Sequence, residues 1–135
     1  MLLRMMLLSF IFLSGCAADD SVNTFADLTA DYQSIQDVVF TPTCALSNCH
    51  RGSVPKAGLN LEAANAYASI VDRPSTTSSS ILRVASGDPN NSYLIDVLEG
   101  NARSTVGTMP RNGSPLPQSV IDKIRQWIAD GALRE

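Results

Sequence analysis

Histidine is nearly absent from this sequence, and methionine is scarce beyond its first residues. His50 is the only histidine among the 135 residues. Three of the four methionines are Met1, Met5 and Met6, so Met109 is the only one in the rest of the chain. A metal site built from several histidines is therefore excluded. Beyond the first residues, the chain offers one imidazole and one thioether as ligands.

Basic charge and sequence repeats are also lacking. Lysine and arginine together number 10 against 13 aspartates and glutamates, which gives a net charge of -3 at pH 7. Nucleic-acid-binding domains carry a basic surface, so we expect no nucleic-acid partner. No internal repeat is visible, and the length suits a single domain of ordinary size.

The N-terminal apolar run is too short to cross a membrane as a permanent helix. It extends over residues 5–13 and follows the positively charged Arg4, so residues 1–15 are predicted to be a secretory signal peptide. The stretch Leu13-Ser14-Gly15-Cys16 resembles a bacterial lipobox. This resemblance implies cleavage after Gly15 and diacylation of Cys16. An ordinary signal peptide with an incidental cysteine is the alternative.

These features predict an exported lipoprotein, anchored in the cell envelope through the lipid on Cys16 and facing the periplasm. Ala17, rather than an aspartate, follows the lipidated cysteine, which favours the outer membrane. Residues 16–29 are polar and are predicted to be a tether. Residues 30–135 are predicted to form the folded domain.

The two remaining cysteines stand immediately before the histidine, in Cys44-Ala45-Leu46-Ser47-Asn48-Cys49-His50. Two thiols can add to the vinyl groups of a haem while the adjacent imidazole binds the iron. The usual spacing leaves two residues between the cysteines, whereas four separate them here. The extra residues must therefore bulge outward, and the stretch resembles the C-x4-C-H variant of the cytochrome c haem site. Met109 lies in a segment whose glycines and prolines forbid a long helix and whose prolines make it rigid, and it is the candidate for the second axial ligand.

Hydrophobic periodicity predicts an all-α domain. The expected helices cover residues 30–40, 62–71, 89–99 and 118–130, with an irregular segment over 101–117. Thr41-Pro42-Thr43 is expected to end the first helix. The last helix is expected to pack across the first and to bury Trp127. Asp88 is interpreted as a helix cap and Asp96 as part of a solvated helix face.

Several stretches together resemble the exported bacterial monohaem cytochromes c with C-x4-C-H sites. The resemblance extends over about residues 30–132. The stretches that carry it are Phe40-Thr-Pro-Thr-Cys44, Cys49-His50, Gly58-Leu-Asn-Leu61, Gly87-Asp-Pro-Asn-Asn-Ser-Tyr-Leu94, Met109-Pro110 and Ile124-Arg-Gln-Trp-Ile-Ala-Asp-Gly-Ala132. The resemblance implies a class I cytochrome c fold, with the N- and C-terminal helices packed together around one covalent haem c. It implies that Cys44 and Cys49 attach the haem and that His50 and Met109 bind its iron.

The function implied is the transfer of single electrons to and from redox partner proteins. An enzyme is not expected, because both axial positions are filled and the chain shows no acid–base pair or activated nucleophile. If Met109 did not bind, an open-site haem sensor or a peroxidase-like protein would be the alternative.

Two alternatives without haem stay open. A structural or binding lipoprotein with a Cys44–Cys49 disulfide explains the cysteines, but it gives His50 and Met109 no role. It also leaves a small core, since only 6% of residues are aromatic. A metal module of Cys44, Cys49 and His50 lacks a fourth ligand of the usual kind.

The lipid anchor gives the first prediction. Mass spectrometry of the mature protein should find an acylated Cys16 at its N-terminus. Cys16→Ser should release the domain from the membrane fraction without affecting haem content, because the anchor and the haem motif use different cysteines. An unmodified Cys16, or cleavage at another position, would contradict this prediction.

Overall fold

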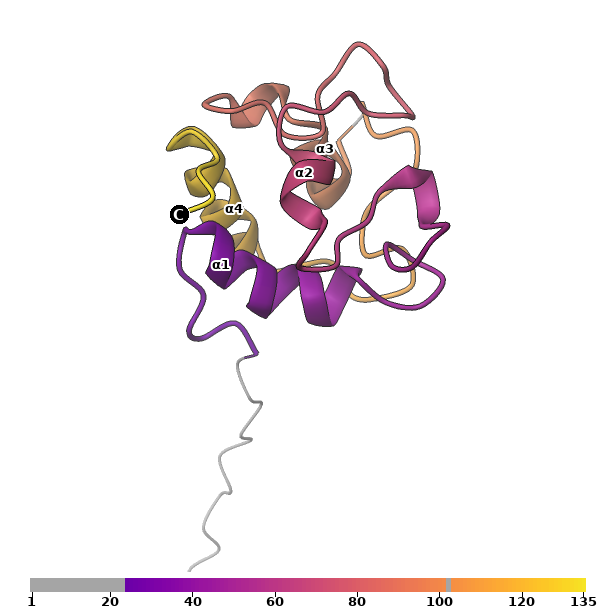
Figure 1. Cartoon of the computed structure of the whole chain (residues 1–135). Helices are drawn as coiled ribbons and strands as arrows, with labels where there is room; N and C mark the ends of the chain where they lie inside the picture. The colour runs from indigo at the N-terminus through magenta and orange to yellow at the C-terminus, as the bar shows by residue number, and fades with distance from the viewer. Residues whose placement is uncertain (1–23, 102) are drawn as a thin grey trace, which may run out of the picture.

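In the computed structural model, residues 24–101 and 103–135 are described. The predicted signal peptide and Cys16 lie outside the described residues. The described chain forms a small, mostly helical domain with four α-helices (Figure 1): α1 (Tyr32–Ile35), α2 (Ala66–Ile70), α3 (Tyr93–Glu99) and α4 (Gln118–Ala129). Within these ranges there is no β-sheet, only isolated bridges between extended residues. The prediction of an all-α domain is confirmed at this level.

None of the described helices is long and apolar enough to cross a membrane. The packed part of the domain begins slightly before residue 30, where the sequence placed its boundary. Leu28 is buried in the core, and its backbone N–H donates to the Phe25 carbonyl. The last residues of the predicted tether therefore belong to the folded domain.

The first helix does not end where the sequence predicted. Asp31 caps it by accepting a hydrogen bond from the Ser34 N–H at 2.9 Å. Instead of stopping at residues 41–43, α1 continues as a π-helical segment, η1 (Gln36–Cys44), which contains Pro42. In an α-helix the ring of Pro42 would clash with the carbonyl four residues earlier. The wider turn accommodates it, and the helix carries on as far as Cys44.

The middle of the chain supplies two short helices. α2 is shorter than the predicted helix over 62–71. Asp88 caps the 3-10 turn η3 (Pro89–Asn91), as predicted, by accepting from the Asn91 N–H at 3.2 Å. α3 ends at Gly100, whose φ of +67° suits a residue without a side chain.

The interpretation of Asp96 as part of a solvated face is wrong. The residue is only 1% exposed. Its carboxylate binds Arg103, which lies beyond the end of α3 and reaches back to it at 2.9 Å. Helical periodicity could not reveal this burial, because the covering residue belongs to an irregular segment.

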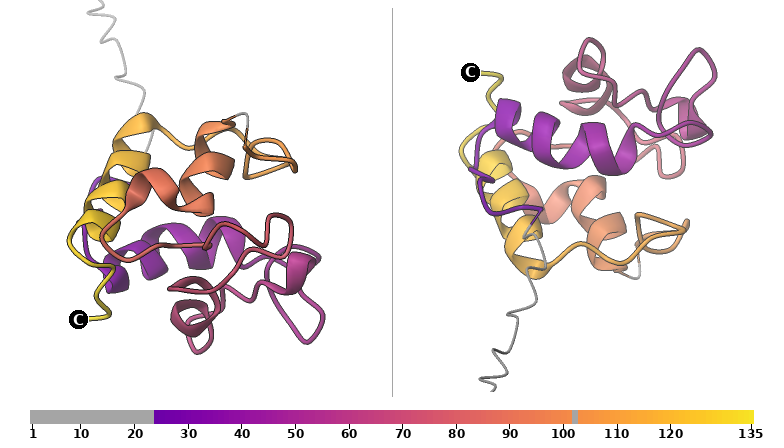
Figure 2. Two further views of the ribbon diagram at one scale, coloured as in Figure 1. Left: turned by 90° about the horizontal axis from the view of Figure 1, so that it is seen from above. Right: turned by 90° about the horizontal axis from the view of Figure 1, so that it is seen from below.

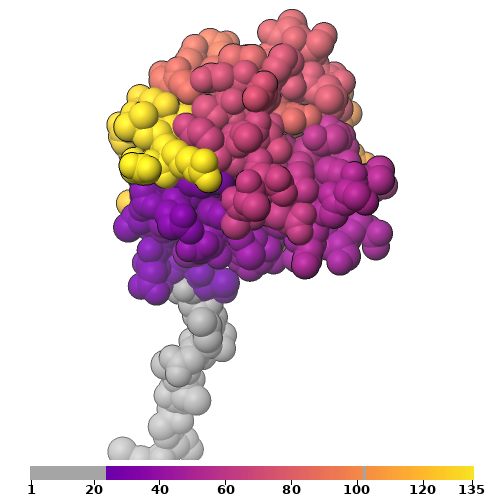
Figure 3. Space-filling view, viewed as in Figure 1, coloured from indigo at the N-terminus to yellow at the C-terminus, as the bar shows by residue number. Residues whose placement is uncertain are grey.

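The packing of the C-terminal helix against the first helix is confirmed. Trp127 is 2% exposed, and its ring centroid lies 5.8 Å from that of Tyr32. The indole N–H donates to the Leu133 carbonyl at 2.7 Å, which folds the C-terminal residues back onto the helix. Figure 2 shows α4 beside the first helix in both views, and Figure 3 shows the C-terminal residues lying against the N-terminal part of the domain.

Candidate functional site

A cavity of about 800 Å³ lies between the end of the first helix and α3. All four residues that the sequence singled out in the domain line it: Cys44, Cys49, His50 and Met109. Its volume is in the range of pockets that hold small molecules and cofactors, about 300–1,000 Å³. The structure therefore brings together side chains that are far apart in the sequence.

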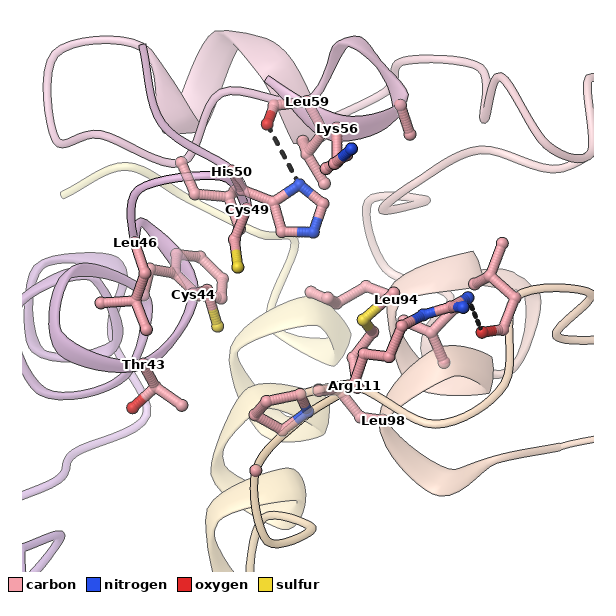
Figure 4. Close-up of a pocket in the computed structure, with 18 of the residues that line it drawn as sticks. Thr43, Cys44, Leu46, Cys49, His50, Lys56, Leu59, Leu94, Leu98 and Arg111 are labelled. Atoms are coloured by element: carbon pink, nitrogen blue, oxygen red, sulfur yellow. Dashed lines mark hydrogen bonds between the residues drawn. The ribbon is translucent and has the colours of Figure 1, made fainter. Parts of the chain in front are cut away.

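The two cysteines and the histidine approach the cavity from one side (Figure 4). The loop between the cysteines closes on itself, because the Cys49 N–H donates to the Leu46 carbonyl at 3.0 Å and the His50 N–H to the Cys44 carbonyl at 3.3 Å. Residues 46–48 are exposed, whereas Ala45 is buried. Leu46 and Asn48 nevertheless line the cavity, so exposure alone does not place these residues outside it, and the expected outward bulge stays a prediction.

Both cysteines are free thiols in the structure, but their surroundings differ. Cys49 is exposed at the cavity mouth, whereas Cys44 is half-buried at the end of η1. Burial, with a smaller contribution from the neighbouring Cys49, raises the pKa of Cys44 to about 12. Cys44 is therefore a protonated thiol at neutral pH.

His50 is held by a hydrogen bond between its Nδ1 atom and the Leu59 carbonyl, 3.2 Å apart. A carbonyl oxygen only accepts, so the proton resides on Nδ1. Burial lowers the pKa of His50, which keeps the ring neutral at pH 7. The second ring nitrogen points into the cavity (Figure 4). A neutral imidazole oriented in this way is a metal ligand.

The backbone that follows His50 is fixed by a small polar network. The carboxylate of Glu62 accepts from the Gly52 N–H at 3.1 Å and from the Asn60 side chain at 3.0 Å, and it forms an ion pair with Arg51 at 3.3 Å. These contacts hold the pKa of Glu62 below its usual value. They close the loop that carries the Leu59 carbonyl back to His50.

Met109 belongs to the opposite wall. Its backbone N–H donates to the Val97 carbonyl of α3 at 2.8 Å, and its half-buried side chain packs against the core. Leu94 and Leu98 of the same helix lie across the cavity from His50 in Figure 4. The structure thus places the imidazole and the thioether on facing walls of one cavity.

The rest of the wall is apolar and carries positive charge. Lys56, Arg83 and Arg111 line the cavity, and no aspartate or glutamate is found among the described residues that line it. Arg83 is partly buried, and among the described residues its guanidinium donates to two backbone carbonyls, those of Ser69 at 2.8 Å and Ala57 at 2.9 Å. The apolar lining includes Val39, Phe40, Leu59, Leu61, Leu94, Val97, Leu98, Leu116 and Ile124.

Nothing in the sequence pattern predicted that these three cations would line the cavity. They come from separate loops and share no motif, so only the folded chain brings them to one cavity. A large apolar wall with uncompensated cations suits a flat apolar ligand that carries acidic groups.

Comparison of the chain with protein-family models, with curated proteins and with solved structures found no match. Within the described ranges, no group of three or more histidine, cysteine, aspartate or glutamate side chains is placed to hold a metal ion. Function must therefore be argued from the cavity and its four potential attachment groups.

The conformation of Asn48 generates a prediction. Its φ is +65°, in the left-handed region that asparagine and glycine tolerate better than other residues. Asn48→Val should lower the free energy of unfolding by about 1–2 kcal/mol, because a β-branched side chain is strained there. Denaturant unfolding of the whole domain measures the change.

Ser47→Val is the matched control, since Ser47 is exposed in the same loop and its φ is not positive. It should change stability by no more than about 0.5 kcal/mol. Equal effects of the two substitutions would show that the backbone at Asn48 is not under this constraint.

Proposed function

We propose that this domain is a c-type cytochrome that transfers single electrons through one covalently attached haem. The observation that carries the proposal is the convergence of Cys44, Cys49, His50 and Met109 on one apolar cavity. Two thiols, a neutral imidazole and a thioether are the groups by which such a haem is attached and ligated. The proposed fold is correspondingly class I cytochrome c-like, which the packing of Trp127 against Tyr32 supports.

The residues present fit this group in three respects. Cys44 and Cys49 would hold it through thioether bonds, and His50 would bind its iron through the free ring nitrogen. Met109 would occupy the other axial position. The apolar wall would cover the macrocycle, and the cations at the cavity would neutralise its two carboxylates.

The bound haem would supply reversible one-electron chemistry, and the protein would control its environment. The Leu59 carbonyl fixes the tautomer and orientation of His50. The apolar wall would keep water from the covered part of the bound group. Because His50 and Met109 would both be held to the iron, the chain would leave no ligand site for a substrate, and the protein is proposed to be an electron carrier and not an enzyme.

The proposed setting follows from the N-terminal sequence. A lipid on Cys16 would anchor the domain to the envelope, facing the periplasm, in the outer membrane. The partners proposed are other redox proteins.

Covalent attachment is tested by expression in a host with a c-type haem maturation system. The protein should keep its haem in a denaturing gel and stain for haem peroxidase activity. Cys44→Ser/Cys49→Ser should lose the stain, because no thioether bond can form, whereas Cys16→Ser should keep it. A colourless wild type with a Cys44–Cys49 disulfide in such a host would refute the proposal.

The role of Met109 is tested by spectroscopy. A thioether ligand raises the reduction potential and closes the sixth position. The wild type should be low-spin in both oxidation states, with a weak long-wavelength Met–iron band when oxidised. Met109→Ala should lose that band, lower the potential by on the order of a hundred millivolts and bind cyanide readily.

Val106→Ala is the control for this substitution, because Val106 lines the cavity from the same segment but has no ligating atom. It should retain the band and the potential. A wild type that is already high-spin, or a Met109→Ala protein with an unchanged spectrum, would remove Met109 from the proposed ligand set.

The charge of Arg83 gives a further prediction. A cation near the iron favours the reduced form, which carries one positive charge fewer. Arg83→Gln should therefore lower the reduction potential by on the order of tens of millivolts. Arg73→Gln is the control: Arg73 is exposed and outside the cavity lining, although its carbonyl accepts a hydrogen bond from the Arg83 N–H at 2.7 Å. Equal shifts in the two variants would contradict a role for Arg83 at the cavity.

A further inference from the structure

Asp96 is a buried carboxylate that the proposed function does not use. It is 1% exposed, and it lies on α3 between residues that line the cavity and residues that do not. Its Oδ1 atom accepts from Nη2 and Nε of Arg103 at 2.9 and 3.2 Å and from the Asn101 side chain at 3.3 Å. Among the described residues, its Oδ2 atom has no hydrogen-bond partner. A buried charge with an unpaired oxygen contributes little to stability, so its presence calls for another explanation.

The partners of Asp96 all belong to the segment that leads to Met109. Arg103 is about half exposed and reaches inward to the carboxylate, and it also donates to the Asn90 carbonyl. The Asn101 N–H donates to the backbone carbonyl of Asp96 at 2.9 Å. Asp96 therefore fixes the beginning of the segment against α3.

Two further contacts fix the remainder of this segment to the same helix. The Tyr93 hydroxyl contacts Thr105, accepting from its backbone N–H at 3.3 Å, and the Met109 N–H donates to the Val97 carbonyl at 2.8 Å. Within the segment, the Ser104 hydroxyl donates to the Gly107 carbonyl at 2.7 Å. The Glu99 carboxylate also accepts from the Asn101 side chain at 3.0 Å. Among the described residues, Asp96 is the group on α3 that forms an ion pair with the segment.

We propose that Asp96, through Arg103, is a positioning residue that holds the 101–109 segment so that the Met109 thioether stays on the cavity wall. The proposal rests on the proposed function, in which Met109 is an axial ligand. Without the Asp96–Arg103 pair, the segment loses its charged attachment and the Met109 side chain leaves its place. The Cys44, Cys49 and His50 wall does not depend on the pair.

The test uses the full-length, haem-loaded protein carrying Asp96→Asn or Arg103→Gln. Each variant should keep its covalent haem but lose the Met–iron band. Cyanide affinity and the hydrogen-exchange rate of the Met109 amide should each rise by at least about tenfold. The amide measures the position of the segment independently of the haem spectrum.

The chain offers a matched control on the same helix. Arg125 of α4 forms an ion pair with Glu99 at 2.8 Å and donates to the Asn90 side chain at 2.9 Å. Glu99 itself also accepts from Asn101, so the control substitution is made at Arg125, whose hydrogen bonds join α4 to residues that precede the segment. Arg125→Gln should reduce thermal stability while leaving the Met–iron band, cyanide affinity and Met109 amide exchange at their wild-type values. If Arg125→Gln abolishes the band as fully as Arg103→Gln does, the role of Asp96 is merely structural and the proposal is wrong.

The double variant Asp96→Asn/Arg103→Gln guards against simple misfolding, because it leaves no unpaired buried charge. A folded double variant without the band supports positioning, whereas one that keeps the band and a slowly exchanging Met109 amide overturns the proposal. If the wild type itself lacks the band, the axial role of Met109 fails. Amide exchange then decides alone whether Asp96 holds the segment.

Discussion

The first helix has to pass a proline before it reaches Cys44. Pro42 has no N–H to donate, and its ring cannot share an α-helical turn with the carbonyl four residues earlier. The widened η1 segment resolves this conflict without ending the helix, since the Ala45 N–H donates to the Phe40 carbonyl five residues back at 2.7 Å. The position of Cys44 at the cavity, and with it the placement of the loop to His50, depends on that turn.

Two walls enclose the cavity. One is built from residues that are close together in the sequence, and the other lies much further along the chain. The first comprises Cys44, Cys49, His50 and the returning loop to Glu62, all joined by short-range hydrogen bonds. The second is α3 with the segment to Met109. Apolar residues of both walls, among them Phe40 and Leu98, also belong to the core, while the cavity opens to solvent beside Cys49. The net acidic chain nevertheless places only basic charged groups at this cavity.

Much of the fold could be predicted from the sequence, because helical periodicity is a local property. The burial of Trp127 and the cap at Asp88 were predicted correctly. The end of the first helix was not, since the sequence shows that Pro42 disturbs an α-helix but not how the chain adjusts. The burial of Asp96 was also missed, because it is imposed by Arg103 from an irregular segment.

The candidate site likewise contains residues that the sequence predicted and residues that it did not. The Cys44–His50 stretch was visible as a motif, and Met109 was found because no other methionine follows Met6. Lys56, Arg83 and Arg111 were not identified, because their convergence is a property of the tertiary structure. The presence of haem, the ligands of its iron and the anchor at Cys16 stay predictions.

The distribution of the two walls along the chain also bears on how the domain folds. Contacts between neighbours such as Cys44, Cys49 and His50 close short loops and form at small cost in chain entropy. The wall that carries Met109 must be brought across a much longer stretch of chain, and such non-local contacts form slowly. We therefore expect the Cys44–His50 loop to form before the wall that carries Met109 closes over the cavity.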